Sequence, residues 1–325
     1  MNTPNTLYPL KFRPILKKKV WGGMKLDKLL QKNTQGNVGE SWEISGVEGN
    51  ISEIANGRFK GKNLNWLLER YKEQLVGQKV YQDFGNKFPL LFKFIDAREA
   101  LSVQVHPDDR LAKKRHNSFG KTEMWYILDA DPGARLIIGF NQKVDVQKYL
   151  RYLSDHKITE LLHSETIQQG DAFILKPGTI HAIGAGVMLA EIQQTSDITY
   201  RIYDWDRPDT DGNLRELHTD LALEAIDFNS PTAKLNYTIA KNWPSLIGTT
   251  DFFTVNRLSL SKSYIRNLAE IPSFVVYMCA EGSATLETDG FSGTINKGET
   301  VLIPAEISKL KFIAQAASFL EVFIP

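Results

Sequence analysis

Apolar and polar residues alternate along much of the chain in short runs, and turn residues separate these runs. Residues 101–106 alternate throughout and residues 122–127 in part, which predicts half-buried strands. Three further short apolar runs also predict strands, at residues 173–175, 188–192 and 301–303. Apolar residues at helical spacing occur in two places, residues 64–71 and 144–153. Many short strands and few helices predict a mainly β protein built of sandwiches or barrels rather than a doubly wound sheet.

A weak internal repeat divides the chain into two parts. Residues 169–177 resemble residues 297–304, because each segment places a turn glycine before an apolar strand that stops at a proline. We therefore expect two copies of one β unit, the second filling roughly the last ninety residues. The polar stretch at residues 229–242 is the expected join. The predicted division is a first domain of residues 1–235 and a second of residues 236–325.

The composition is that of an ordinary globular protein, with 42% hydrophobic and 24% charged residues. The formal net charge of +1 provides no field for sequence-independent nucleic-acid binding, so no nucleic-acid partner is expected. The single cysteine, Cys279, excludes an intrachain disulfide and a multi-thiolate zinc site, and its apolar neighbours predict a buried side chain. No secretory signal and no run near ~20 apolar residues are visible, so we expect a cytoplasmic protein without a membrane partner.

Three polar side chains project from one face of the strand at residues 101–106. With a period of two, Ser102, Gln104 and His106 share this face, while the apolar residues occupy the other. Polar groups on an otherwise apolar strand face water or converge on another polar group.

Two other segments add donors of the same kind. Glu123 shares a strand face with Lys121, and His181 follows a tight turn at the end of an apolar strand. Two neutral imidazoles, a carboxylate and the amide oxygen of Gln104 would suit a borderline divalent ion such as Zn²⁺. The alternative is a set of separate surface or hydrogen-bonded core residues, and for any single histidine this alternative is stronger. For the four residues together, their spacing in the sequence decides between a metal site and separate residues.

The spacing resembles that of the two cupin motifs. In the usual second motif a histidine lies eleven residues after a first glycine, with another glycine between, and Gly170, Gly178 and His181 have this register. In the first motif, Gln104 replaces the usual first histidine of a His-x-His pair.

That replacement narrows the resemblance to the type I mannose-6-phosphate isomerases, in their shorter bacterial form. The segments that carry it are residues 21–23, 39–45, 88–97, 101–109, 121–126, 177–182 and 191–207. They follow in order from about residue 7 to about residue 210. The resemblance implies a mainly β fold of two cupin-type β-barrels (jelly rolls), with a few helices attached to the first.

The resemblance also implies a site and a reaction. It implies one zinc ion per chain, held by Gln104, His106, Glu123 and His181. It further implies three catalytic residues, Arg201, Lys121 and Glu191, and two substrate-binding residues, Ser102 and Lys93. The reaction is the interconversion of mannose 6-phosphate and fructose 6-phosphate through an enediol, and the expected partner is a small phosphorylated sugar.

Several alternatives stay open. Arg201 also suits a structural salt bridge, and Lys93 and Ser102 also suit plain hydrogen bonding. Glu191 suits a general base or a carboxylate that supports the metal ligands. Two other functions remain, an Fe(II)-dependent cupin dioxygenase and a cupin that binds sugar phosphates without turnover. In the second repeat Lys309 occupies the position that His181 has in the first. We therefore expect the second unit to bind no metal and to pack against the first as a structural partner.

Overall fold

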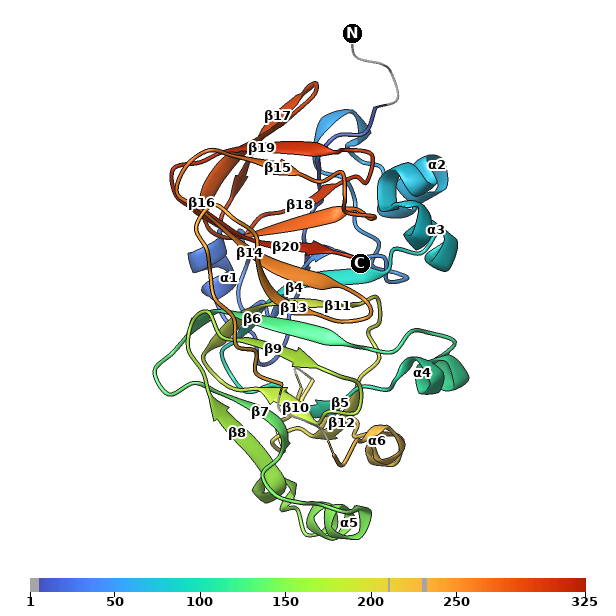
Figure 1. Ribbon diagram of the computed structural model, residues 1–325. Coiled ribbons are helices and arrows are strands. Elements are labelled where there is room, and N and C mark those ends of the chain that lie inside the picture. Colours follow the sequence, from blue (N-terminus) through green and yellow to red (C-terminus); the bar gives the residue numbers. More distant parts are fainter. Residues whose placement is uncertain (1–5, 210, 230–232) are drawn as a thin grey trace.

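The computed structural model describes residues 6–209, 211–229 and 233–325. Strands dominate its regular structure, and they form three sheets stacked along the long axis of the molecule (Figure 1). The prediction of a mainly β protein is therefore confirmed. Residues 230–232 of the predicted join lie outside the described residues.

Two of the sheets come from the first part of the chain and lie face to face. The six-stranded sheet has the order β2 (Ile15–Lys17), β3 (Glu40–Ile44), β4 (Leu90–Ala97), β11 (Val187–Gln194), β6 (Glu123–Ala130) and β9 (Ala172–Leu175). The five-stranded sheet has the order β12 (Tyr200–Tyr203), β5 (Val103–Val105), β10 (His181–Ile183), β7 (Arg135–Phe140) and β8 (Leu162–Thr166). Apolar residues of both sheets, among them Trp125 and Leu136, form one core between them.

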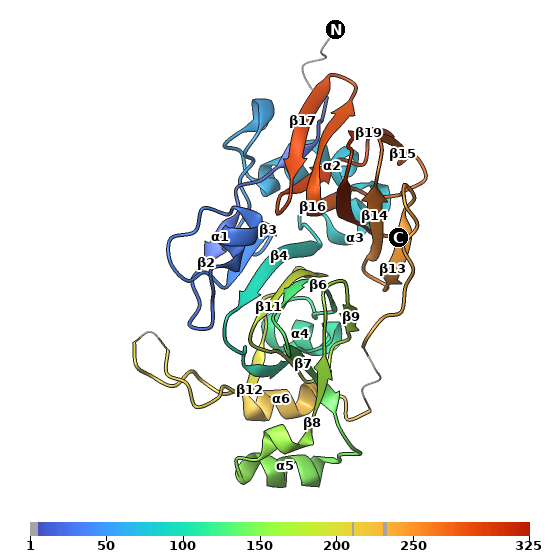
Figure 2. The same cartoon turned by 90° about the vertical axis from the view of Figure 1, so that its left-hand side faces the viewer.

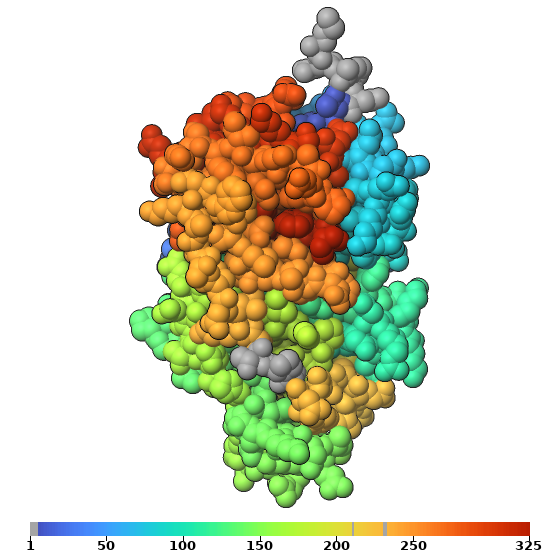
Figure 3. All heavy atoms as spheres, in the orientation of Figure 1, coloured from blue at the N-terminus to red at the C-terminus, as the bar shows by residue number. Residues whose placement is uncertain are grey.

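The third sheet has nine strands, and one of them comes from the N-terminal segment. Its main path is β1 (Leu10–Lys11), β18 (Thr300–Ile303), β16 (Val275–Thr288), β20 (Ala317–Phe323), β14 (Thr254–Leu260) and β13 (Ser245–Thr249). The long strand β16 continues into an outer layer with β17 (Phe291–Asn296), β19 (Lys309–Ile313) and β15 (Tyr264–Asn267). These segments form the orange and red end of the molecule in Figure 3. As predicted, Cys279 is buried among them, and burial raises the pKa of its thiol to about 12.

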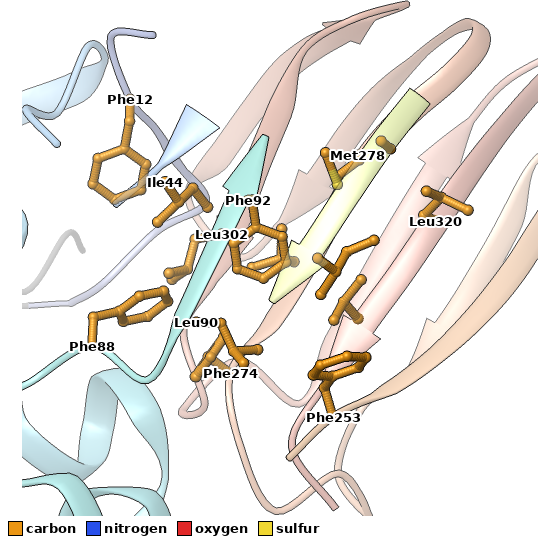
Figure 4. Packing of buried hydrophobic residues seen from close by; sticks show 14 of the residues in the cluster. Phe12, Ile44, Phe88, Leu90, Phe92, Phe253, Phe274, Met278, Leu302 and Leu320 are labelled. Atoms are coloured by element: carbon orange, nitrogen blue, oxygen red, sulfur yellow. The ribbon is translucent and has the colours of Figure 1, made fainter. Parts of the chain in front are cut away.

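The six-stranded sheet is covered on both faces. Every residue of β4 and of β11 is buried. Phe92 of β4 points toward the nine-stranded sheet and packs in one core with Met278 and Leu320 (Figure 4). Ile95, which points the other way, packs in the core shared with the five-stranded sheet. The middle sheet therefore joins the two halves of the molecule.

The expectation of two closed barrels is not confirmed, because in the described residues no sheet closes on itself. The chain crosses between the six-stranded and the five-stranded sheet several times, for example at residues 98–102 and at residues 184–186. Because the ladder of hydrogen bonds between neighbouring strands is interrupted at such corners, the first half is an open sandwich of two sheets.

The described residues contain six α-helices, and the spacing of apolar residues predicted two of them. The two predicted helices are present as α2 (Leu64–Val76) and α5 (Val146–Ser154). The other four are short: α1 (Lys25–Leu30), α3 (Gln78–Phe84), α4 (Asp109–His116) and α6 (Thr219–Ala225). Asp108 caps α4 by accepting a hydrogen bond from the Leu111 amide, a start signal that the sequence carries. Across the described ranges, each helix is too short or too polar to cross a membrane.

The internal repeat is visible in the local geometry of the two halves. Gly170 and Gly298 both lie in the left-handed region, with φ of 91° and 84°. A strand begins two residues after each glycine, and another begins eleven residues after each, at His181 and at Lys309. His181 is buried whereas Lys309 is exposed. The second copy thus repeats the strands of the first without its histidine.

Candidate metal centre and the cleft beside it

The four side chains predicted to bind a metal come from the two facing sheets. His181 begins β10, where its backbone pairs with that of Gln104 on β5. His106 directly follows β5, and Glu123 is the first residue of β6 in the opposite sheet. Because residues two apart share a strand face, Gln104 and His106 both project toward Glu123. The strand register therefore explains why four residues from three segments meet.

The histidine and glutamate side chains form a close cluster. The ligand atoms of His106, Glu123 and His181 all lie within 4.8 Å of one another. Glu123 Oε1 is 3.3 Å from His181 Nε2, and Glu123 Oε2 is 3.7 Å from His106 Nε2. All three side chains are buried. Two imidazoles and a carboxylate that converge in this way form a donor set for a divalent metal.

Both imidazoles present an unprotonated Nε2 to the cluster. Nδ1 of His106 lies 2.9 Å from the carbonyl oxygen of Ile198, and Nδ1 of His181 lies 2.9 Å from that of Thr179. A carbonyl only accepts hydrogen bonds, so each Nδ1 carries a proton and donates it. Burial lowers the pKa of His181 to about 4 and the pKa of His106 well below its usual range. Both rings are therefore neutral near pH 7 and turn an Nε2 lone pair toward Glu123.

Both oxygens of the Glu123 carboxylate are buried, and Oε1 has no hydrogen-bond donor among the described residues. The ammonium of Lys121 forms an ion pair with it, with Nζ 2.9 Å from Oε2. Burial raises the pKa of Glu123 to about 7, against the opposing effect of Lys121. A buried carboxylate oxygen without a partner is costly, and a bound cation would compensate Oε1. The residues present therefore fit a divalent metal ion.

Gln104 extends this donor set toward solvent. Its Nε2 lies 3.2 Å from Nε2 of His181. Because that imidazole nitrogen is unprotonated, the amide group donates to it. Half a turn of the amide would present the carbonyl oxygen instead, which is the atom that binds cations. Gln104 can therefore serve as a fourth ligand without movement of the backbone.

A second buried ion pair lies next to the cluster. Lys93 of β4 and Glu191 of β11 are direct cross-strand neighbours, and Lys93 Nζ donates to Glu191 Oε2 at 2.7 Å. Trp125 Nε1 donates to the other oxygen of Glu191 at 3.1 Å. Burial alone would raise the pKa of Glu191, but Lys93 and Lys121 outweigh burial and lower the pKa to about 2. Glu191 is thus held in one orientation as an ionised carboxylate.

A cleft of about 230 Å³ opens beside these residues. Six of the predicted site residues line it: Lys93, Ser102, Gln104, Lys121, Glu191 and Arg201. The three buried ligands do not line the cleft, but they are in contact with Gln104 or Lys121 at its wall. The structure therefore brings all nine predicted residues together.

Other residues of the cleft were not singled out from the sequence. The charged and polar ones among them are Lys19, Glu40, Asp197, Thr199 and Arg215. Glu40, Asp197 and Thr199 fall within the segments that carry the family resemblance, so a signal for them was present. The sequence gave no such signal for Arg215, because this residue lies outside those segments. It reaches the cleft from the long loop between β12 and α6. This loop extends from the body of the molecule (Figure 2).

Two family models match parts of the chain. A family model described as phosphomannose isomerase type I, catalytic domain, matches residues 10–132. A second model, described as mannose-6-phosphate isomerase, cupin domain, matches residues 245–318.

Full-length relatives carry the same name. The chain is 34% identical over 312 residues to mannose-6-phosphate isomerase ManA of Bacillus subtilis, covering 94% of this chain and 96% of that protein. It is 34% identical over 317 residues to mannose-6-phosphate isomerase of Streptococcus mutans, covering 94% and 95%. The crystal structure of the mannose 6-phosphate isomerase from Bacillus subtilis matches with a TM-score of 0.89 at 29% identity, covering 98% of this chain and 100% of that one.

Replacement of His181 by Ala tests the metal centre. The change removes one of three converging donors, so we expect bound metal to fall from about one equivalent per chain to a small fraction of that, as measured by elemental analysis. His163→Ala is the matched control, because the side chain of His163 is 49% exposed and lies outside the cluster. Stoichiometric metal in the His181 variant would contradict the ligand role.

Proposed function

The chain belongs to the type I mannose-6-phosphate isomerase family, and from this premise we propose that it interconverts mannose 6-phosphate and fructose 6-phosphate. The observation that carries the proposal is the buried cluster of His106, Glu123 and His181 beside a cleft rich in cationic side chains. A metal-binding cluster beside positively charged side chains suits a small sugar that carries negative charge. We propose one Zn²⁺ per chain, with Gln104 as the fourth ligand.

The reaction moves a proton between C2 and C1 of the open-chain sugar through an enediol. It requires removal of a proton next to a carbonyl group and stabilisation of the negative charge that develops on oxygen. A bound divalent ion supplies a Lewis acid that polarises the carbonyl and the neighbouring hydroxyl. This chemistry involves no net oxidation of the sugar, so it needs no organic redox cofactor.

Lys121 and Arg201 are the cations that we assign to the reacting end of the sugar. Lys121 Nζ lies 2.9 Å from Glu123 and 3.2 Å from Nε2 of His106, so it stands between the cluster and the cleft. Arg201 is the direct cross-strand neighbour of Gln104. Each can donate hydrogen bonds to an oxygen on which negative charge develops, in a site where low dielectric strengthens the interaction.

Glu191 and Lys93 support this arrangement. The sequence left two roles open for Glu191, a general base or a supporting carboxylate. A carboxylate with a pKa of about 2 and two hydrogen bonds is a weak base, so we assign Glu191 the supporting role. Burial opposes the charge of Lys121, but Glu123 and Glu191 outweigh burial and raise the pKa of Lys121. The lysine is thereby kept as a charged ammonium group that donates hydrogen bonds. Ser102, at the wall of the cleft, is assigned to hydrogen bonding with the substrate.

We further propose that the chemistry is confined to residues 1–235, with residues 236–325 as a structural partner. The repeat supports this division, because the position equivalent to His181 holds the exposed Lys309. The middle sheet explains why the second part is needed. Without the nine-stranded sheet, Phe92 and its neighbours on that face would be exposed to water.

A coupled assay tests the proposed function. Metal-replete protein should convert mannose 6-phosphate to fructose 6-phosphate at a rate typical of enzymes, on the order of 1–1000 per second. Oxygen uptake is followed in parallel, because a dioxygenase would consume oxygen and an isomerase would not. Substrate binding without conversion would instead identify a binding protein and end the isomerase proposal.

Replacement of Arg201 by Ala tests its assignment to the reacting end. Loss of a donor to the developing oxyanion should lower kcat by roughly 100-fold or more, while the metal content stays unchanged. Arg135→Ala, at an exposed position of β7, is the control for loss of an arginine. Normal turnover by the Arg201 variant would show that this assignment is wrong.

A further inference from the structure

The lysines of the cleft are already paired with carboxylates. Lys93 Nζ lies 2.7 Å from Glu191, and Lys121 Nζ lies 2.9 Å from Glu123. Lys19, nearer the solvent, lies 3.2 Å from Glu40. Each of these ammonium groups therefore has its charge balanced before any substrate enters. A doubly charged phosphate group needs cations whose charge is less fully balanced.

Two arginines provide such a surplus of positive charge. Arg201 Nη1 donates to the carbonyl oxygen of Glu216 at 2.7 Å. This contact places Arg201 beside Arg215, the residue that directly precedes Glu216. Nε of Arg201 is buried and has no hydrogen-bond partner among the described residues. Burial and the charge of Arg215 both lower the pKa of Arg201, and Asp204 and Glu216 only partly oppose them. Two like charges thus lie close together at one wall of the cleft.

The carboxylate of Asp204 accepts hydrogen bonds from two arginines, Arg215 and Arg207. Asp204 is buried and accepts hydrogen bonds from Nε and Nη2 of Arg215. The same carboxylate also accepts a hydrogen bond from Arg207 at 3.1 Å. Asp204 therefore fixes the plane of the Arg215 guanidinium without balancing all of the positive charge around it. Arg215 lines the cleft in this fixed orientation.

The strand order places Arg201 on the strand next to Gln104 of the metal centre, and Arg215 beyond that strand, farther from the metal centre. Arg201 is the cross-strand neighbour of Gln104, which in turn is the neighbour of His181. Neighbouring strands lie about 4.8 Å apart, so the backbone of Arg201 is roughly 10 Å from that of His181. Arg215 comes from the loop beyond β12, the edge strand of this sheet. In a hexose 6-phosphate, the phosphate is likewise at the opposite end from C1 and C2.

We propose that Arg215 binds the phosphate group of the substrate and thereby sets the preference for phosphorylated over neutral sugars. Arg201 lies between Arg215 and the metal centre and contacts the sugar on the side of the reacting carbons. The inference rests on the proposed function, because it takes C1 and C2 to lie at the metal centre. It assigns the phosphate to a residue for which the sequence gave no signal.

Steady-state kinetics of Arg215→Gln test the proposal. A charge-assisted bidentate contact is lost, so we expect KM for mannose 6-phosphate and the inhibition constant of inorganic phosphate each to rise about tenfold to a hundredfold. The value of kcat should stay within about threefold and the metal content should not change, because the lost contact is equal in the ground state and the transition state. Arg215→Lys keeps the charge without the planar fork, so it should fall between wild type and Arg215→Gln.

Leu214→Ala is the matched control, because Leu214 precedes Arg215 in the same loop and its side chain is 69% exposed. Its kinetic constants should equal those of the wild type. Wild-type KM and phosphate inhibition in Arg215→Gln would overturn the proposal. A joint fall of kcat and metal content would also overturn it, because that result indicates a purely structural role.

Calorimetric titration of the metal-loaded protein with inorganic phosphate separates this inference from the proposed function. Phosphate binding needs no turnover, so it is measurable even in a protein that does not isomerise sugars. Weaker binding to Arg215→Gln than to the wild type supports the phosphate site. Equal binding to both proteins contradicts it, whether or not the wild type is an isomerase.

Discussion

The central strands of the six-stranded sheet are buried on both faces, and this burial determines where polar side chains can lie. Strands such as β4, β6 and β11 cannot place polar groups in solvent on either side. On the face toward the nine-stranded sheet they carry residues such as Phe92 and Met124, which pack in the shared core. On the other face the alternate positions are divided between apolar residues and charged ones. Period-two alternation thus separates the residues that hold the two halves together from those that form the site.

Charge on the second face is tolerated only because it is paired. Lys93 and Glu191 form an ion pair between the neighbouring strands β4 and β11, and Lys121 forms an ion pair with Glu123. Each pair would be costly to break, because removing one partner leaves an uncompensated charge in a poorly solvated site. Water is largely excluded here, so these charges act strongly on one another and on a bound substrate. The surplus of positive charge at Arg201 and Arg215 is therefore available to an anionic substrate, because the lysines are already paired with carboxylates.

Much of the site could be predicted from the sequence because its geometry is local. Alternation placed Gln104 and His106 on one strand face, and the eleven-residue step placed His181 after a turn. The resemblance supplied Arg201, Lys93 and Glu191, and the structure brings them to the same cleft. Arg215 could not be predicted, because its position depends on a long loop and on an ion pair with Asp204. The choice between a sandwich and a barrel stayed open for a similar reason, since strand patterns do not reveal whether a sheet closes. Among the four short helices of the described residues only α4 begins with a side-chain cap, which Asp108 provides.

The central claim is that the cluster of His106, Glu123 and His181 holds a divalent ion on which isomerisation depends. The most direct measurement removes metal with a chelator and then follows isomerase activity as Zn²⁺ is added back in known amounts. We expect no turnover at the start, followed by a linear rise that reaches its plateau at about one equivalent per chain. Full activity in protein shown by elemental analysis to be free of divalent metal would contradict it.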